Sequence, residues 1–352
     1  MTKTILTLGS SLLLSSLLVA CSGEQKTTDA SSKDNSPKEK PQFTRKQYTE
    51  PHLGTSVQVV FYTTKPGEAD ALAKKCFDKV KELNAVFSDY DSKSEVSILC
   101  QKALRTPHKV SQDLFSVIET AQQVSKATEG AFDITLGQLT KHWGAQARLH
   151  KVAQKTVDPD RKTTEEIPKV SYTDLILDPN KQTVAMSKRI SIDLGGIAKG
   201  YIADQLIALL KEEDINHAGV LIGGEIVVGD APPGKEGWSI GLENPEYKTV
   251  GKLSLSNASM STSGDSYQFY ETKGVRHAHI IDPKKRQSKN DRLNVTVIAS
   301  SGTLADAWAT ALRVSKKSDA LEMANKYKVK AAFLSLEEPI LRSHTFPELK
   351  KK

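Results

Sequence analysis

The sequence predicts a mixed α/β protein of the α+β class, with one main body over residues 51–345. Strand-like segments occur both in runs and in alternation with helical segments, which favours a mixed sheet over a doubly wound parallel one. About 300 residues follow the polar N-terminal stretch, enough for one large domain or two closely associated ones. No internal repeat divides the chain.

Each element follows from hydrophobic periodicity and from turn signals. Residues 55–62 alternate and are rich in β-branched side chains, which is typical of a strand, and residues 69–87 have helical periodicity. A second amphipathic helix at 113–128 ends before Gly130, where a left-handed residue is expected. Further strands are expected in two pieces within 169–184, at 219–228 with a break at Gly223-Gly224, and at 238–242, 252–255, 278–281 and 294–299. Further helices are expected at 201–213 and 304–314.

The first 21 residues predict a targeting segment that is not part of the fold. Lys3 precedes an apolar run, residues 5–20, that is shorter than a comfortable membrane span and ends at Cys21. This pattern is typical of a bacterial lipoprotein signal, in which Cys21 becomes the lipidated first residue; an ordinary signal peptide with an incidental cysteine is the alternative. Residues 22–50 hold almost nothing apolar and are expected to be a disordered tether, because they cannot bury enough surface to fold.

The formal charge of +7 does not indicate a nucleic-acid partner. Much of it lies outside the body: removing Lys3, one net positive charge in residues 22–50 and the three C-terminal lysines leaves +2 on residues 51–349. No run of Lys and Arg and no ladder of aromatic residues indicates a nucleic-acid surface. A small anionic ligand is compatible with this charge.

Two cysteines belong to the body, Cys76 and Cys100. Cys76 lies on the helical pattern at 69–87 and is expected in the core, where cysteine is common. The targeting segment indicates a compartment in which disulfides can form, and spacing alone leaves a bridge between the two open. Neither residue has the spacing of a metal ligand.

The most informative segment runs from Ser191 to Asp204. It contains Asp193, three glycines and Lys199 where a strand is expected to turn into a helix. Glycines let the backbone approach a ligand closely because no Cβ intervenes, and the N–H groups at a helix start favour an anion. The segment therefore predicts a phosphate-facing turn flanked by Asp193 and Lys199.

A second informative segment runs from Ser301 to Leu312. Asp306 and Thr310 are four residues apart, so on a helix they share one face. Their oxygens are hard ligands that suit Mg²⁺ or Ca²⁺ and not zinc. Thr303 and Asp306 fit a capping box equally well, in which Asp306 would only satisfy backbone donors at the helix start.

Other segments carry weaker signals. His277 and His279 lie on one face of an expected strand, where a neutral imidazole can accept a proton or orient a leaving group; a structural role is the alternative. The hydroxyl-rich run 259–265 fits either a polar binding loop or a solvated turn. The loops 88–95 and 131–135 each place an aromatic ring beside an acid, which suits a flat heterocycle with hydrogen-bonding edges.

Taken together, these motifs occur in the order of one known family. They are Leu53-Gly54-Thr55, Tyr90 with Ser94-Glu95, Gly130 to Thr135, Asp193 to Gly200, Gly223-Gly224-Glu225, Thr262 to Asp265, His279 to Pro283 and Ala305 to Thr310. This order resembles the ApbE family, the periplasmic FAD:protein FMN transferases, over nearly all of residues 52–315. The glycine turn and the helix with Asp306 and Thr310 are the specific parts of the resemblance.

The resemblance implies an ApbE-like fold in which FAD is the substrate and FMN is transferred to a threonine or serine hydroxyl of a target protein, with release of AMP. It implies catalytic roles for His279, which would activate the acceptor hydroxyl, and for Asp306. The implied contacts to FAD are Leu53, Tyr90, Ala131, Phe132, Asp133, Asp193, Lys199 and Ile280. The implied Mg²⁺ ligands are a backbone oxygen of Gly196 and the side chains of Asp306 and Thr310, and Ca²⁺ or Mn²⁺ would suit the same oxygens.

The family also implies a lipid anchor on the periplasmic side of a bacterial membrane. The implied acceptors are subunits of a Na⁺-translocating NADH:quinone reductase or of an Rnf-type complex. Two other functions would use the same residues. One is that of a metal-dependent FAD pyrophosphatase, with water as the acceptor. The other is that of a lipid-anchored protein that binds flavin and catalyses no reaction. Leu53 stands where the family usually has Met, and Cys100 where an Asn is common.

Overall fold

The computed structural model describes residues 41–144, 167–265, 269–272, 275–289, 291–336 and 339–350; for residues 270, 272, 275 and 276 it describes the backbone only. The predicted signal segment with Cys21, and residues 22–40 of the predicted tether, lie outside the described residues. Among the helices that the structure describes, none has both the length and the apolar composition needed to cross a bilayer.

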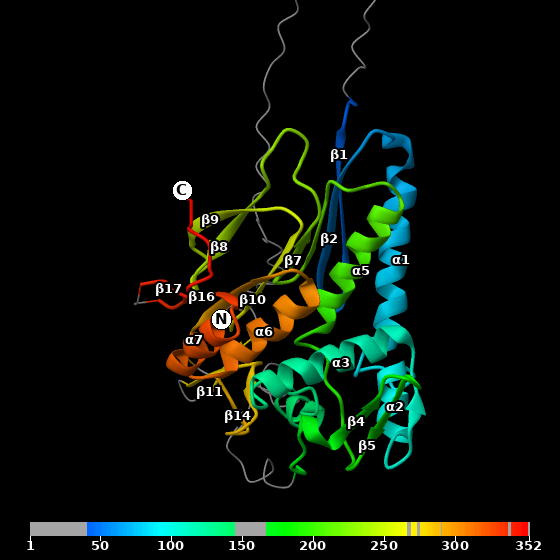
Figure 1. Cartoon of the computed structure of the whole chain (residues 1–352), viewed down its shortest axis with the longest axis vertical. Helices are drawn as coiled ribbons and strands as arrows, with labels where there is room; N and C mark the ends of the chain where they lie inside the picture. The colour runs from blue at the N-terminus through cyan, green and yellow to red at the C-terminus, as the bar shows by residue number, and fades with distance from the viewer. Residues whose placement is uncertain are drawn as a thin grey trace, which may run out of the picture.

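An eight-stranded sheet forms the centre of the molecule (Figure 1), and every neighbouring pair in it is antiparallel. Its strand order is β1-β2-β6-β7-β10-β15-β16-β17. The bounds of these strands are Thr44–His52, Thr55–Thr63, Ala218–Ile222, Glu225–Val228, Ala258–Ser263, Asn294–Ala299, Lys330–Leu334 and Leu341–Arg342. The order of the first four is set by the tight hairpins β1–β2 and β6–β7, which are joined through the pairing of β2 with β6.

Helices cover one face of this sheet: α1 Ala69–Phe87, α5 Ala198–Glu212, α6 Gly302–Val314 and α7 Lys317–Lys326. Two more helices, α2 Glu95–Lys102 and α3 Gln112–Ala127, pack against α1 and, for α3, also against α6. Figure 1 shows α1 and α5 along one side of the sheet, and α6 with α7 farther towards the C-terminal strands. Val57, Val59 and Phe61 of β2 alternate onto this face and are fully buried against the helices. Each such side chain contributes roughly 1.5–3 kcal/mol relative to an exposed one.

The opposite face is covered by a two-stranded ribbon, β8 (Trp238–Glu243) and β9 (Thr249–Leu255). Val60, which points away from the helices, packs in one cluster with Trp238 and Phe346. Strand β9 also bridges to the C-terminal segment, where Lys252 and Lys350 exchange backbone hydrogen bonds. The sheet is therefore buried on both faces.

Besides the β8–β9 ribbon, three more small sheets lie outside the central one in the described part of the chain. β3 (His108–Lys109), β5 (Thr183–Met186) and β4 (Leu175–Asp178) form the first, in that order. The hairpin β11 (Phe269–Thr272) with β12 (Val275–Ala278) and the pair β13 (Ile281–Asp282) with β14 (Gln287–Ser288) form the others. The segment with His277 and His279 lies on β12 and in the bend between β12 and β13.

The expected α+β class is confirmed, and the 69–87 helix and the 294–299 strand have the expected bounds. The boundary at residue 50 is wrong, because β1 begins at Thr44 and pairs along its whole length with β2. The body also continues past 345 to the bridge at Lys350. Cys76 is buried as expected, and the open disulfide is absent from the described residues, where Cys76 and Cys100 are both free thiols.

Two expected segments have a different structure. The hydroxyl-rich run that fitted a loop or turn is mostly strand β10, in the middle of the sheet, and Ser259 and Ser261 on it are buried. The expected strand at 278–281 is also wrong: β12 ends at Ala278 and β13 begins at Ile281, with a bend between them. Small hydroxyl side chains gave no hydrophobic alternation, which is why periodicity missed β10.

Candidate functional site

Two hairpin turns meet at one end of the central sheet. Leu53 and Gly54 join β1 to β2 with φ angles of +54° and +69°. Gly223 and Gly224 join β6 to β7, and the Gly223 N–H donates to the carbonyl of Ser56 at 3.3 Å, which places the turns side by side. A leucine rarely adopts a positive φ, and such backbone outliers cluster at functional sites.

Beside these turns lies a buried cluster of one ammonium and two carboxylates. Nζ of Lys199, at the start of α5, lies 3.4 Å from Oδ2 of Asp306 on α6 and 3.4 Å from Oε1 of Glu225 on β7. Nζ also donates to the carbonyl of Gly195 at 2.6 Å. Oδ2 of Asp306 accepts a further hydrogen bond from the N–H of Gly200 at 3.2 Å. The two carboxylate side chains are 4% and 5% exposed, so water does little to screen them, whereas the Lys199 side chain is 28% exposed.

The three groups shift one another's protonation. Burial opposes the charge on Lys199, but Asp306 and then Glu225 outweigh it, so the pKa of Lys199 is raised. Burial, and then the negative charge of Asp306, raises the pKa of Glu225 to about 8 against the opposing effect of Lys199. Burial also raises the pKa of Asp306, although Lys199 and the Gly200 N–H oppose the shift. One ammonium therefore does not fully compensate two buried carboxylates.

Glu225 was not identified as a site residue from the sequence. Its Oε2 is buried and has no hydrogen-bond partner in the part of the chain that the structure describes. A buried polar atom without a partner is costly, and in native proteins it calls for an ion, a proton or a ligand. The available signal was an acid directly after Gly223-Gly224 and before the apolar run 226–228.

The predicted metal ligands come together at the glycine turn. A Cβ on Gly196 would lie 3.0 Å from Oγ1 of Thr310 and 3.2 Å from Cε2 of Phe132, so the turn sits against both side chains. Asp306 lies one turn before Thr310 on α6. Among the described residues no three His, Cys, Asp or Glu side chains group as a metal site, so a cation here would need hydroxyl and carbonyl oxygens as well. A carboxylate, a hydroxyl and backbone carbonyls are the oxygens that fit Mg²⁺, and the unpartnered oxygen of Glu225 lies in the same charged cluster as Asp306.

The capping-box alternative for Asp306 is wrong. The N-cap of α6 is Ser301, and its Oγ accepts from the N–H of Leu304 at 3.3 Å. Asp306 instead faces α5, where its carboxylate contacts Lys199 and Gly200. In a capping box, Asp306 would bond only to backbone N–H groups at the start of α6. Its contacts with Lys199 and Gly200 exist because α6 packs against α5.

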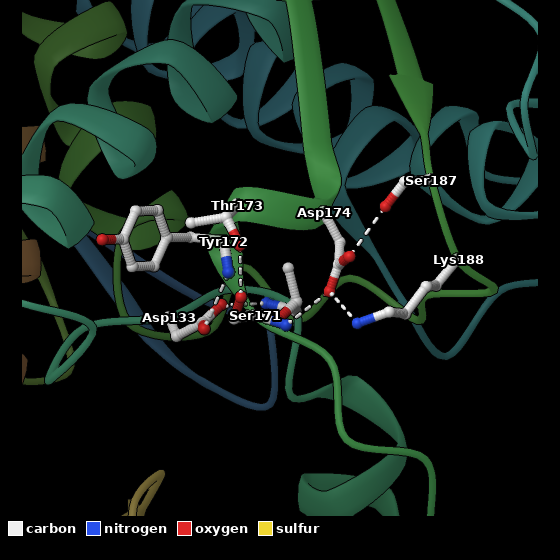
Figure 2. A network of polar contacts seen from close by, with 8 residues as sticks. Asp133, Ser171, Tyr172, Thr173, Asp174, Ser187 and Lys188 are labelled. Atoms are coloured by element: carbon white, nitrogen blue, oxygen red, sulfur yellow. Dashed lines mark hydrogen bonds and ion pairs between the residues drawn. The ribbon is translucent and has the colours of Figure 1, made fainter.

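Asp193 and Asp133 both hold backbone in place. Oδ1 of Asp193 accepts from the N–H of Gly195 at 2.7 Å, which folds the glycine turn back on itself. Oδ1 of Asp133 accepts from the backbone N–H and the hydroxyl of Thr135, and its Oδ2 accepts from the N–H of Tyr172 at 2.9 Å. Figure 2 shows Asp133 beside residues 171–174, where Asp174 contacts Ser187 and Lys188. Burial raises the pKa of Asp133 despite these donors.

Tyr90 lies at a cavity that the residues just before the glycine turn also line. Its side chain is 83% exposed, and the cavity has a volume of about 270 Å³. The lining residues are Asp89, Tyr90, Ser92, Val96, Ser97, Cys100, Gln101, Lys141, Ser191 and Ile192. Ser191 and Ile192 directly precede Asp193, so the cavity and the charged cluster lie at the two ends of one segment.

The two histidines do not share a face, contrary to expectation. His277 is on β12, buried, with its ring stacked on Trp143 at a centroid distance of 6.0 Å. His279 lies in the bend after β12 and is exposed. Ile280 is buried against Val314, the last residue of α6, so the bend is attached to the helix that carries Asp306. Of the two, only His279 is accessible to an acceptor.

The raised pKa of Glu225 predicts a pH-dependent stability. In the metal-free protein the folded state holds a proton on Glu225 that the unfolded chain releases above its usual pKa of 4.5. The stability that this group contributes is therefore lost as pH rises from 4.5 towards about 8. With EDTA present, the melting temperature of the wild type is expected to fall across this range by more than that of Glu225→Gln. Equal slopes in the two proteins would contradict the prediction.

Solved structures share this fold. A flavin transferase ApbE from Vibrio cholerae superposes with a TM-score of 0.76 and 26% identity, covering 87% of this chain and 99% of that one. The ApbE protein from Thermotoga maritima superposes with a TM-score of 0.77 and 27% identity, covering 88% and 100%. The fold and these similarities define an enzyme of the transferase class.

The sequence comparisons agree. The model of the ApbE family matches residues 53–334. A Haemophilus influenzae protein named FAD:protein FMN transferase is 32% identical over 288 residues, which cover 78% of this chain and 82% of that protein. A Vibrio cholerae protein of the same name is 30% identical, covering 79% and 84%. The chain belongs to the ApbE family.

Proposed function

We propose that this protein transfers the FMN part of FAD to a threonine or serine hydroxyl of a target protein and releases AMP. The acceptor oxygen would form a bond to the phosphorus of the FMN phosphate, and the bond from that phosphorus to the bridging pyrophosphate oxygen would break. The proton of the acceptor hydroxyl would leave, and AMP would carry away the bridging oxygen. The names of the relatives support FAD as the substrate and a protein as the acceptor.

The observation that carries the proposal is the meeting of a glycine turn with the charged cluster of Lys199, Glu225 and Asp306. Gly195 and Gly196 expose backbone at the start of α5, and Lys199 stands beside them with its pKa raised. A protonated ammonium and the positive end of the α5 dipole favour a pyrophosphate, while the N–H of Gly200 is already bonded to Asp306. Lys199 would bind the nucleotide close to its phosphates, and Asp193 would hold the turn in the shape that accepts them.

Asp306, Thr310 and a backbone oxygen of Gly196 would hold Mg²⁺ there. When bound, the metal would neutralise pyrophosphate charge, and phosphoryl transfer depends mostly on such electrostatics and on positioning. Leu53, Tyr90, Ala131, Phe132 and Ile280 would contact FAD through side chains or backbone. His279 would accept the proton of the acceptor hydroxyl, a role that its exposure in the bend after β12 supports.

The test is to incubate the full-length protein with FAD, Mg²⁺ and an acceptor subunit of the Na⁺-translocating NADH:quinone reductase or Rnf kind. We expect a fluorescent band that survives a denaturing gel, with the mass of FMN on one threonine or serine, and an equal amount of AMP. An acceptor with that residue changed to valine serves as the control. FMN and AMP released without any adduct would identify a pyrophosphatase, and bound but intact FAD would identify a flavin-binding protein.

We also propose that Cys21 is lipidated and anchors the protein on the periplasmic side of a bacterial membrane. Cys21→Ser is expected to move the protein from the membrane fraction to the soluble periplasmic fraction, because the lipid is the anchor. Cell fractionation and labelling with radioactive palmitate measure this directly. A Cys21→Ser protein that stays in the membrane fraction would contradict the lipid anchor.

A further inference from the structure

Two short segments on α5 and α6 share the pattern Gly-x-x-Ala-Asp. They are Gly200–Asp204, with sequence GYIAD, and Gly302–Asp306, with sequence GTLAD. Their glycines lie backbone to backbone: a Cβ on Gly200 would be 2.1 Å from the carbonyl oxygen of Gly302, and a Cβ on Gly302 would be 2.5 Å from that of Gly200. The two helix starts therefore meet in a nearly symmetric contact.

Across this contact, each aspartate accepts a hydrogen bond from the glycine N–H of the other helix. Oδ2 of Asp306 accepts from the N–H of Gly200 at 3.2 Å, and Oδ1 of Asp204 accepts from the N–H of Gly302 at 2.6 Å. Each helix thus supplies a carboxylate to an unsatisfied backbone donor at the start of the other. A carboxylate in this position stabilises a helix start by hydrogen bonding and by its charge.

The symmetry ends at the remaining contacts. Oδ2 of Asp204 accepts from both the N–H and the hydroxyl of Thr303, at 2.9 and 2.6 Å. Asp306 instead contacts Lys199 and lies in the charged cluster with Glu225. In the described part of the chain the hydrogen bonds of Asp204 go to the start of α6, whereas Asp306 belongs to the candidate site.

We propose that Asp204 is a positioning residue for the cation site. By fixing the first turn of α6 against α5, it sets where Asp306 lies relative to Lys199 and Gly196. The inference rests on the proposed role of Asp306 as a metal ligand. Replacing groups that orient metal ligands typically lowers metal affinity by about 10- to 100-fold.

Asp204→Asn is the first variant, since it keeps the size and one acceptor oxygen but loses the charge and the second acceptor. Thr303→Val is a milder change that removes only the hydroxyl donor, and Thr303→Ser restores that donor. Ser301→Ala is the matched control, because it removes a cap of the same helix that makes no contact with α5 among the bonds described. Asp204→Asn, Thr303→Val and Ser301→Ala all weaken the start of α6. Only Asp204→Asn and Thr303→Val weaken the hydrogen bonds between that start and Asp204.

Two measurements on the full-length, FAD-free protein test the proposal. Binding of Mn²⁺ alone, measured by electron paramagnetic resonance, is expected to weaken about tenfold in Asp204→Asn and less in Thr303→Val. Hydrogen exchange of a peptide containing Gly200 is expected to quicken in the same two variants, because the bond from Gly200 to Asp306 loosens. Thr303→Ser and Ser301→Ala are expected to match the wild type in both measurements.

Folded Asp204→Asn and Thr303→Val proteins with wild-type Mn²⁺ affinity and wild-type exchange at Gly200 would overturn the proposal. So would Ser301→Ala if it changed both measurements as much as Asp204→Asn. If the wild type itself bound no Mn²⁺, the metal assignment in the proposed function would fall, and the exchange at Gly200 would still decide whether Asp204 positions Asp306.

Discussion

Asp306→Asn is expected to slow FMN transfer by about a thousandfold without unfolding the protein. Asparagine retains an oxygen that can accept from the Gly200 N–H. Without the negative charge of Asp306 the pKa of Glu225 falls, so Glu225 becomes the charged partner of Lys199. The negative charge beside Thr310 is nevertheless lost. A bound metal supplies several kcal/mol of transition-state stabilisation, and ~4 kcal/mol corresponds to about a thousandfold in rate.

The measurement is the rate of acceptor flavinylation at saturating FAD over a range of Mg²⁺ concentrations. Asp319→Asn is the matched control, since Asp319 is an exposed aspartate in the first turn of α7, away from the cluster. Thermal unfolding reports whether the variants fold. A folded Asp306→Asn protein with the transfer rate of the wild type would remove Asp306 from the mechanism.

Gly200→Ala is expected to destabilise the protein by about 3 kcal/mol or more and to abolish transfer, as overpacking of close contacts does. The added Cβ would lie 2.1 Å from the carbonyl oxygen and 2.4 Å from the carbonyl carbon of Gly302. Both are backbone atoms, so relief requires α5 and α6 to separate. Separation would also pull Asp306 away from Lys199.

The direction of this effect is informative, because intrinsic helix propensity favours alanine over glycine by about 1 kcal/mol. If propensity dominated, Gly200→Ala would be more stable than the wild type. Gly67→Ala is the control, since a Cβ there meets no atom within 4 Å. Denaturant unfolding of the two variants compares them, and a Gly200→Ala protein at least as stable as Gly67→Ala would refute the close packing of the two helix starts.

Much of the fold could be predicted from the sequence where side chains alternate or recur with a clear period. The 69–87 helix is an example, because Phe77, Val80 and Leu83 lie on one buried face. β10 was not predicted, because its buried positions are serines and a methionine and show no hydrophobic alternation. β1 was not predicted either, because its polar side chains face solvent at the edge of the sheet and its order comes from pairing with β2.

The site was predictable to the extent that its residues are close in sequence. Asp193, Gly196 and Lys199 lie on one turn, and Asp306 and Thr310 on one helical face. The link between the two segments was not predictable, because it depends on how α5 packs on α6. Glu225 was missed for the same reason: only the sheet pairing brings the β7 residue to Lys199. Whether Asp306 caps its own helix or belongs to the site also could not be decided from the sequence, because the answer depends on its contacts with α5.

The unpaired thiols have a practical consequence for producing the protein. Cys76 and Cys100 are free, so the described part of the chain contains no disulfide for an oxidising compartment to form. A version that starts after Cys21 is therefore expected to fold in the reducing cytosol of a bacterial host, without disulfide-forming enzymes. Reducing agents can also stay in the buffer during purification, which protects the partly exposed Cys100 from oxidation.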